Sequence, residues 1–513
     1  MKSKRIIAVV LLSALLLSLF SGCTKTESDA TIVDGKKVVD TDIVMATTAD
    51  IVTFDPQDCT DGYSGTALTY IFDTLVEFDE NSELVGSLAE SWENPSPLEY
   101  TFHLRKGVKF HNGEELKVSD VKFTFDRILE NPKSKYILDR MEEFIVIDDY
   151  TFTVKLSEPY SPLLNSLAEY QGSIVNEKAV KEAGENVNMQ PVGTGRLKLG
   201  EYRPNDYTRL DRFDDCWAEK PVMTSLTLKV IPEPATRTIA LESGDVDIVT
   251  ALTSIDVPRI QEDPNLKVYE YAGQALTYLC PNHLREPFDD VRVRQAMNYA
   301  TDQQKIIDVV FEGQAIPATS PFPNIMPSWD ETLNVYSFDL EKAKALLTEA
   351  GYADGIDVEV LVSSEERMRA ATVMQADWAE VGLNMSIEQI EFGTLLDRTN
   401  NADFDAFIMS WGHALNQDRT MTTNFHSSNI NGGGNRAGWV DEETDRLINV
   451  GRTEIEWPKR EQAYKDLQKH LVEQAVWVYL FQQVNYAGMN KNLEGVIWHK
   501  STNHDYGNMY IVE

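Results

Sequence analysis

The stretch Tyr100-Thr-Phe-His-Leu-Arg-Lys-Gly-Val-Lys-Phe-His-Asn-Gly113 is the most informative part of this 513-residue sequence. Apolar and polar side chains alternate on both sides of Lys106-Gly107, which is the period of a half-buried strand. The pattern predicts two strand-like pieces joined at that dipeptide, with alternate side chains held in a core. The same alternation in Thr151–Leu156 predicts another strand.

Helical patterns lie between the predicted strands. Ser119 is in position to cap a helix whose apolar residues share one face, and Thr301 with Gln304 has the spacing of a capping box. Further helices are expected at 235–243, ended by Gly244, at 339–350, ended by Gly351, and around 463–471. Strands are expected at 246–249, 405–410 and 476–480. The sequence therefore predicts a mixed α/β protein without internal repeats.

The N-terminus has the features of a secretory signal. Basic residues are followed by an apolar run at 6–20 that is too short to favour a membrane-spanning helix. Leu19-Phe20-Ser21-Gly22-Cys23 resembles a bacterial lipobox, which predicts a signal peptide at 1–22 and lipidation of Cys23. Ordinary cleavage with an incidental Cys23 stays open. The polar residues 23–42 lack periodicity and are interpreted as a flexible tether to the membrane.

Size and charge limit the remaining choices. About 490 mature residues are too many for one core, so two or three domains are expected. A formal net charge of −35 opposes binding to nucleic acid, and dispersed acidic residues mainly confer solubility. Cys59, Cys216 and Cys280 show no metal-ligand spacing, and a single disulfide among them stays open.

Residues 411–438 break the alternation of strands and helices and are interpreted as an uninterrupted loop. Loops of that length are usually functional or mobile. This one combines flat apolar surface with directional polar groups, which suits ligand contact. A surface excursion without a ligand is the alternative interpretation.

No catalytic motif is present: the sequence has no GxSxG elbow, no HExxH and no phosphate-binding loop. His413 and His426 lie 13 residues apart and do not form a recognisable metal motif. We therefore predict no catalytic residue, no metal and no cofactor.

The chain resembles the dipeptide- and oligopeptide-binding proteins of bacterial ABC importers, known as solute-binding protein family 5. The resemblance rests on several blocks in the correct order, which together span the mature chain: 72–79, 88–92, 100–113, 119–125, 240–248, 287–296 and 339–351. Most of these residues belong to the scaffold and identify the fold.

The resemblance implies a two-lobed α/β fold of the periplasmic-binding-protein type (type II, cluster C), with an extra subdomain inserted in the first lobe. The implied first lobe comprises 43–75, 190–287 and 485–513; the subdomain is 76–189 and the second lobe is 288–484. The receptor would be a monomer that closes on a peptide-like solute and delivers it to a permease and its ATPase.

Some family positions are changed in this sequence. Peptide-binding relatives commonly carry an Asp three residues after the Trp that corresponds to Trp411, whereas this chain has Ala414. Asp418 is a substitute only if the loop folds back. The family's TGPY-like turn becomes Thr194-Gly-Arg-Leu197, in which Arg196 either meets a carboxylate or projects into solvent.

From these residues we predict a ligand site. Trp411 would offer its ring for stacking, and Gly412 would allow the ligand to approach the backbone closely. The resemblance places Tyr63 of the first lobe in a loop that faces the cleft. The remaining predicted contacts are His413, Asp418, Phe425 and, in that first-lobe loop, Tyr63, for which packing in the core is the alternative.

Three functions stay open. The leading hypothesis is a receptor for peptides. The second is a receptor for a nickel-type metal chelate or another small solute, suggested by Ala414 and by His413 and His426. The third is a secreted hydrolase, which turnover of bound peptide or sugar would establish.

Overall fold

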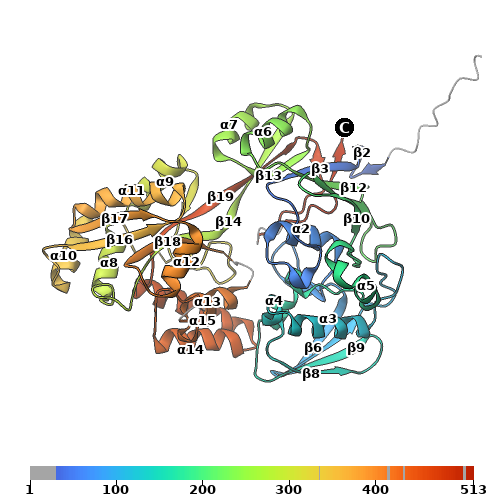
Figure 1. Cartoon of the computed structure of the whole chain (residues 1–513), viewed down its shortest axis with the longest axis horizontal. Helices are drawn as coiled ribbons and strands as arrows, with labels where there is room; N and C mark the ends of the chain where they lie inside the picture. The colour runs from blue at the N-terminus through green and yellow to red at the C-terminus, as the bar shows by residue number, and fades with distance from the viewer. Residues whose placement is uncertain (1–30, 334, 413–415, 431–433, 501–503) are drawn as a thin grey trace, which may run out of the picture.

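A computed structural model describes residues 31–333, 335–412, 416–430, 434–500 and 504–513. Two lobes lie side by side, joined by the long strands β14 (Leu266–Pro281) and β19 (Val478–Asn490), as Figure 1 shows. These strands pair antiparallel along most of their length, with register shifts between Ala272 and Leu276 and again between Thr277 and Tyr278. The fold is therefore mixed α/β and two-lobed, as predicted.

One sheet of 11 strands runs through both lobes, in the order β10-β11-β12-β3-β13-β19-β14-β18-β16-β17, with β15 paired to β19. Its first-lobe part (lobe I) consists of β10 (Leu197–Arg203), β11 (Tyr207–Arg212), β12 (Ser225–Val230), β3 (Asp42–Thr47) and β13 (Ile248–Leu252). The second-lobe part (lobe II) adds β18 (Ala406–Trp411), β16 (Ile356–Val362), β17 (Leu383–Gln389) and β15 (Ala315–Pro317). The two crossing strands therefore connect the lobes through continuous backbone hydrogen bonding.

The first and last described segments of the chain meet in a small sheet of lobe I. Its strands, in the order β1-β2-β21-β20, are β1 (Ile32–Val33), β2 (Lys36–Asp40), β21 (Tyr510–Val512) and β20 (Leu493–Glu494). The flexible tether predicted for 23–42 is therefore wrong over its second half, where backbone pairing with β21 orders the chain. Short polar strands with little burial leave no hydrophobic period for a sequence pattern to detect.

The inserted subdomain has a four-stranded sheet, β6-β7-β9-β8, packed against helix α3 (Val118–Glu130). Its strands are β6 (Ala89–Ser96), β7 (Glu99–Leu104), β9 (Thr151–Leu156) and β8 (Met141–Val146), and it also carries the hairpin β4 (Val76–Phe78) and β5 (Leu84–Gly86). The strands expected near 100 and 151 are confirmed. The second piece after Lys106-Gly107 forms only an isolated bridge between Lys109 and Glu115.

Short helices link the subdomain to the rest of the molecule. They are α4 (Leu163–Leu167), η3 (Tyr170–Gly172), α5 (Glu177–Ala183) and η4 (Gly184–Met189), with η2 (Lys135–Ile137) preceding β8. Lobe I contributes η1 (Pro56–Asp58), α2 (Gly62–Ile71), α6 (Pro234–Ser243), η5 (Ser254–Asp256) and α7 (Val257–Glu262).

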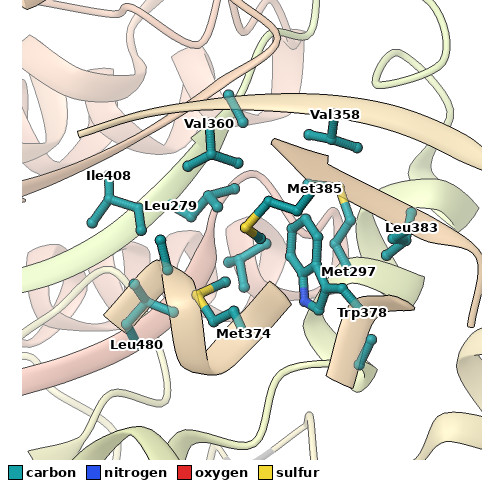
Figure 2. Close-up of a cluster of buried hydrophobic side chains, with 14 of the residues drawn as sticks. Leu279, Met297, Val358, Val360, Met374, Trp378, Leu383, Met385, Ile408 and Leu480 are labelled. Carbon is teal, nitrogen blue, oxygen red and sulfur yellow. The ribbon is translucent and has the colours of Figure 1, made fainter. Parts of the chain in front are cut away.

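Helices cover both faces of the lobe II sheet. They are α8 (Val291–Tyr299), α9 (Gln303–Phe311), α10 (Leu340–Ala350), α11 (Glu365–Ala379), α12 (Phe392–Asn400), α13 (Gln417–Phe425), η6 (Ser427–Asn429), α14 (Glu442–Thr453) and α15 (Trp457–Glu473). Alternate residues of β14 enter different cores: Leu279 packs under α11, and Tyr278 packs under α13 to α15. Figure 2 shows the first of these cores, with Trp378 among methionine and branched aliphatic side chains.

Helix ends test the capping predictions. Gly244 and Gly351 end α6 and α10 in the left-handed region, as expected. The caps predicted at Ser119 and Thr301 are wrong by one or two residues, because Lys117 and Asp302 occupy those positions. The uninterrupted loop predicted for 411–438 is also wrong, since α13 and η6 lie within it.

Two further predictions concern charge and sulfur. Arg196 meets a carboxylate, because its Nη1 lies 2.9 Å from Asp505 Oδ2, which ties the turn before β10 to the C-terminal segment. Cys59, Cys216 and Cys280 are all free thiols, so no disulfide joins them. Across the described residues, the search for a helix both long and apolar enough to cross a bilayer found none.

Candidate functional site

Trp411 ends strand β18 at the point where lobe II meets the crossing strands. It pairs with Leu276 of β14, and its partly buried ring packs against the core under α13 to α15. A Cβ on Gly412 would lie 2.9 Å from the carbonyl oxygen of Gln274 and 3.0 Å from Cα of Ala275. The predicted close approach at Gly412 is therefore one to the backbone of β14.

Asp418 lies in the first turn of α13 and is only 4% exposed. Its carboxylate lies 3.4 Å from Nε of Arg452, accepts a hydrogen bond from Oγ1 of Thr422 at 3.2 Å, and lies 3.4 Å from the hydroxyl of Tyr160. Burial raises the pKa of Asp418, although Arg452 opposes this shift. Its hydrogen-bonding capacity is directed to protein groups, so it does not offer a free carboxylate to a peptide amine.

Phe425 is 1% exposed and its ring centroid lies 4.5 Å from that of Trp477 in the lobe II core. A side chain that is this buried leaves no surface for a solute, so we assign it to packing. Tyr63, in contrast, is 49% exposed in the first turn of α2. It lies on lobe I, where its ring and hydroxyl are available for contact.

His413 and Ala414 lie outside the described residues. His426 caps η6, with Nδ1 2.8 Å from the hydroxyl of Ser428 and 3.8 Å from Oδ1 of Asp445. Among the residues that the structure describes, no three His, Cys, Asp or Glu side chains gather as metal ligands.

Arg367 was not predicted from the sequence and reaches Ser410, the residue before Trp411. Nη1 donates to the hydroxyl of Ser363 at 2.9 Å, and Nη2 donates to the hydroxyl of Ser410 at 3.3 Å. Ser363 follows the carboxyl end of β16 and Ser410 is the penultimate residue of β18, so the guanidinium sits at the sheet edge where α/β proteins bind ligands.

The charge of Arg367 is not matched by a contacting carboxylate among the described residues. Its Nε is buried and has no hydrogen-bond partner there, while the adjacent Glu366 accepts two hydrogen bonds from the side chain of Gln483 in β19. Burial lowers the pKa of Arg367, which still stays charged at neutral pH. A planar cation with spare donors is suited to a carboxylate ligand.

Sequence patterns gave little indication that Arg367 belongs to a site, because a single Arg in Ser363-Ser-Glu-Glu-Arg367 is typical of the polar first turn of a helix. Only the packing of α11 against the ends of β16 and β18 brings it to Ser410. The structure thus places Trp411 and Gly412 at the end of β18 and Arg367 on the preceding Ser410, leaves Tyr63 on the other lobe, and removes Asp418 and Phe425 from the exposed surface.

Two lobes joined by two crossing strands, with partly buried polar and aromatic groups at strand ends, are typical of a solute-binding receptor. Residues 83–433 match the family model described as "Bacterial extracellular solute-binding proteins, family 5 Middle". The chain belongs to this family of receptors for ABC importers, which act outside the cytoplasm and are not enzymes.

Full-length relatives agree with this family. The chain is 30% identical to a di/tripeptide-binding protein of Pseudomonas aeruginosa, over 86% of this chain and 90% of that protein. It is also 30% identical to heme-binding protein A of Haemophilus influenzae, over 83% and 84%. The periplasmic binding protein DppA of Helicobacter pylori, solved with the peptide STSA, is 27% identical with a TM-score of 0.77, over 92% of this chain and 98% of that one.

Proposed function

We propose that this receptor captures short peptides through their free carboxylate and hands them to an ABC permease. The observation that carries the proposal is Arg367, a partly buried guanidinium held by the hydroxyls of Ser363 and Ser410 at the ends of two strands. Relatives named for dipeptides and tripeptides support a peptide as the solute. Arg367 would bind the carboxylate, and Trp411 with Tyr63 of lobe I would contact the rest of the peptide.

Closure would follow from contacts made to both lobes at once. A solute held by Arg367 in lobe II and by Tyr63 in lobe I favours the state in which the lobes are close together. Expulsion of water then strengthens the polar contacts. The closed receptor would present one surface to the permease, whose ATPase supplies the energy for transport.

We also propose that residues 1–22 are removed as a signal peptide and that Cys23 carries the lipid. The order of charge, apolar run and small residues before the Cys supports this processing. The chain available as a tether would then run from Cys23 only as far as β1, because pairing in the small sheet begins at Ile32.

Native mass spectrometry of the purified protein tests the class of solute. A bound mass that is released on denaturation and sequences as a peptide supports the proposal. A heme or a nickel–histidine chelate in the same experiment would overturn the peptide assignment and leave the receptor role intact. Altered rather than intact solute would point to hydrolysis.

The role of Arg367 predicts a specific loss of affinity. Arg367→Ala should weaken binding of a dipeptide about 100-fold, because a charge-assisted, partly desolvated contact to the carboxylate is lost. The C-terminal amide of that dipeptide lacks the carboxylate, so Arg367→Ala and the unmodified protein should bind it with about the same weak affinity. Calorimetry with the paired ligands measures both effects.

Arg369→Ala is a matched control for this experiment. Arg369 lies on the same helix, is exposed, and donates to backbone carbonyls of α9. It should leave both affinities within about twofold. Equal losses for the dipeptide and its amide in Arg367→Ala would show that Arg367 acts on folding rather than on the carboxylate.

A further inference from the structure

The segment from Tyr160 to Ser173 of the inserted subdomain is fixed to lobe I on one side. The side chain of Gln57, in η1, donates to the backbone carbonyls of Gln171 and Ser173 at 3.1 and 2.9 Å. The side chain of Gln171 in turn donates to the carbonyl of Cys59 at 3.1 Å. This segment therefore moves with lobe I.

The same segment also contacts lobe II, through Glu169. Oε2 of Glu169 lies 3.1 Å from Nη1 of Arg419, and Oε1 accepts from Nδ2 of Asn416 at 3.1 Å. Tyr136 of the subdomain adds a hydroxyl that donates to Glu169 at 2.5 Å and a ring that lies under the Arg419 guanidinium, 4.3 Å from its centroid. The ion pair is partly withdrawn from water, since the Glu169 side chain is 19% exposed and that of Arg419 is 33% exposed.

A second contact lies a few residues earlier in the chain. The amide of Ser161 donates to the carbonyl of Arg452 at 2.8 Å, and its hydroxyl donates to the carbonyl of Glu454. The hydroxyl of Tyr160 lies 3.4 Å from Asp418. We call the two contacts together the subdomain latch: Tyr136, Tyr160, Ser161 and Glu169 on one side, and Asn416, Asp418, Arg419 and the 452–454 backbone on the other.

The position of the latch makes it sensitive to the angle between the lobes. In Figure 1, α4 of the subdomain faces α13 at a distance from the crossing strands β14 and β19. Rotation about those strands carries α13 away from α4, which separates Glu169 from Arg419. The latch can therefore form only when the lobes are close together.

Asn416 connects the latch to the start of α13. Its side-chain oxygen caps α13 by accepting from the amide of Arg419 at 3.1 Å, while its Nδ2 reaches Glu169. The contact between Glu169 and Asn416 therefore fixes the first turn of α13 against the subdomain.

We infer that Glu169 is a positioning residue for solute capture: it locks the inserted subdomain onto α13 when the lobes close and so stabilises the closed arrangement. The subdomain then contributes to closure without touching the solute. Because apparent affinity depends on the fraction of receptor in the competent state, loss of the latch weakens binding of any solute. The inference rests on the receptor role of the family and not on a peptide as ligand.

Distances between spin labels test the latch without a solute. The labels replace Asp126 on α3 and Asp466 on α15, both exposed, in a Cys216→Ser chain that begins at residue 31 and so contains every described element. We expect Glu169→Gln to raise the ratio of long to short distances about tenfold, since one charge-assisted contact is lost. The charge-swapped pair Glu169→Arg with Arg419→Glu should recover part of the short population.

Glu158→Gln is the matched control, because Glu158 is an exposed carboxylate of the same subdomain whose one ion pair among the described residues is with Arg140 of that subdomain. It should leave the distance distribution unchanged. The inference is overturned if Glu169→Gln gives the same distribution as this control, or if it only lowers the melting temperature.

Binding of the dipeptide Ala-Phe provides the second measurement. Glu169→Gln should raise its apparent Kd about tenfold, mainly through faster dissociation, and Glu158→Gln should leave it unchanged. Failure of the dipeptide to bind any version contradicts the proposed peptide function, while the label distances still decide the latch.

Discussion

Trp378→Ala should lower the free energy of unfolding of lobe II by about 3–5 kcal/mol, the largest loss that we expect from one substitution in this protein. Trp378 is fully buried on α11, and Figure 2 shows its ring between Met297 and Met385. Its indole nitrogen also donates to the hydroxyl of Thr301 at 3.0 Å, a contact that alanine cannot replace. The cavity left by the ring and the lost hydrogen bond both lower the free energy of unfolding.

Calorimetry resolves this effect if the lobes unfold in separate transitions, as two-lobed proteins commonly do. The transition of lobe II should move to lower temperature, and that of lobe I should stay unchanged. Trp457→Ala is the control, because Trp457 begins α15 with 41% of its surface exposed and should cost less than about 1 kcal/mol. Equal losses in the two variants would contradict the assignment of Trp378 to the core.

The fold was predictable from the sequence because the strands and helices carry their signals locally. The strand at Thr151–Leu156 and the ends of α6 and α10 were all marked by periodicity or by a glycine. The failures occurred where local signals were weak. Helix α13 has several Thr and Asn residues with low helix propensity, and it is stabilised by the Asn416 cap and by packing against the core.

The candidate site was harder to predict, since its residues come from distant segments. Composition marks Trp411, which stays a prediction, but an Asp and a Phe in the same stretch are equally suitable as contacts by residue type. Burial distinguishes these two residues from Trp411. The carboxylate of Asp418 contacts Arg452 and belongs to the latch, and Phe425 packs in the core. Glu169 and Arg419 lie 250 residues apart, a pairing that no sequence period can reveal.

Acidification should destabilise lobe II through His283. Nε2 donates to the carbonyl of Val476 at 2.9 Å, and the ring lies edge-on to Trp439 near the cation of Arg294. Burial, reinforced by Arg294, lowers the pKa of His283 to about 3. The unfolded chain has a histidine pKa of about 6.5 and takes up a proton first as the pH falls.

The sign of this effect follows from that order of protonation. Stability that is fully present above about pH 6.5 is lost as the pH falls toward 3, on the order of 3 kcal/mol by pH 4 for this one group. His283→Gln should remove that part of the pH dependence from urea unfolding of lobe II, whatever it costs at pH 7. His103→Gln, in the inserted subdomain, should leave the pH dependence of the lobe II unfolding free energy unchanged. If the pH dependence of the lobe II unfolding free energy persists in His283→Gln, lobe II loses stability in acid through its carboxylates. His283 would then be protonated in the folded protein without a cost in stability.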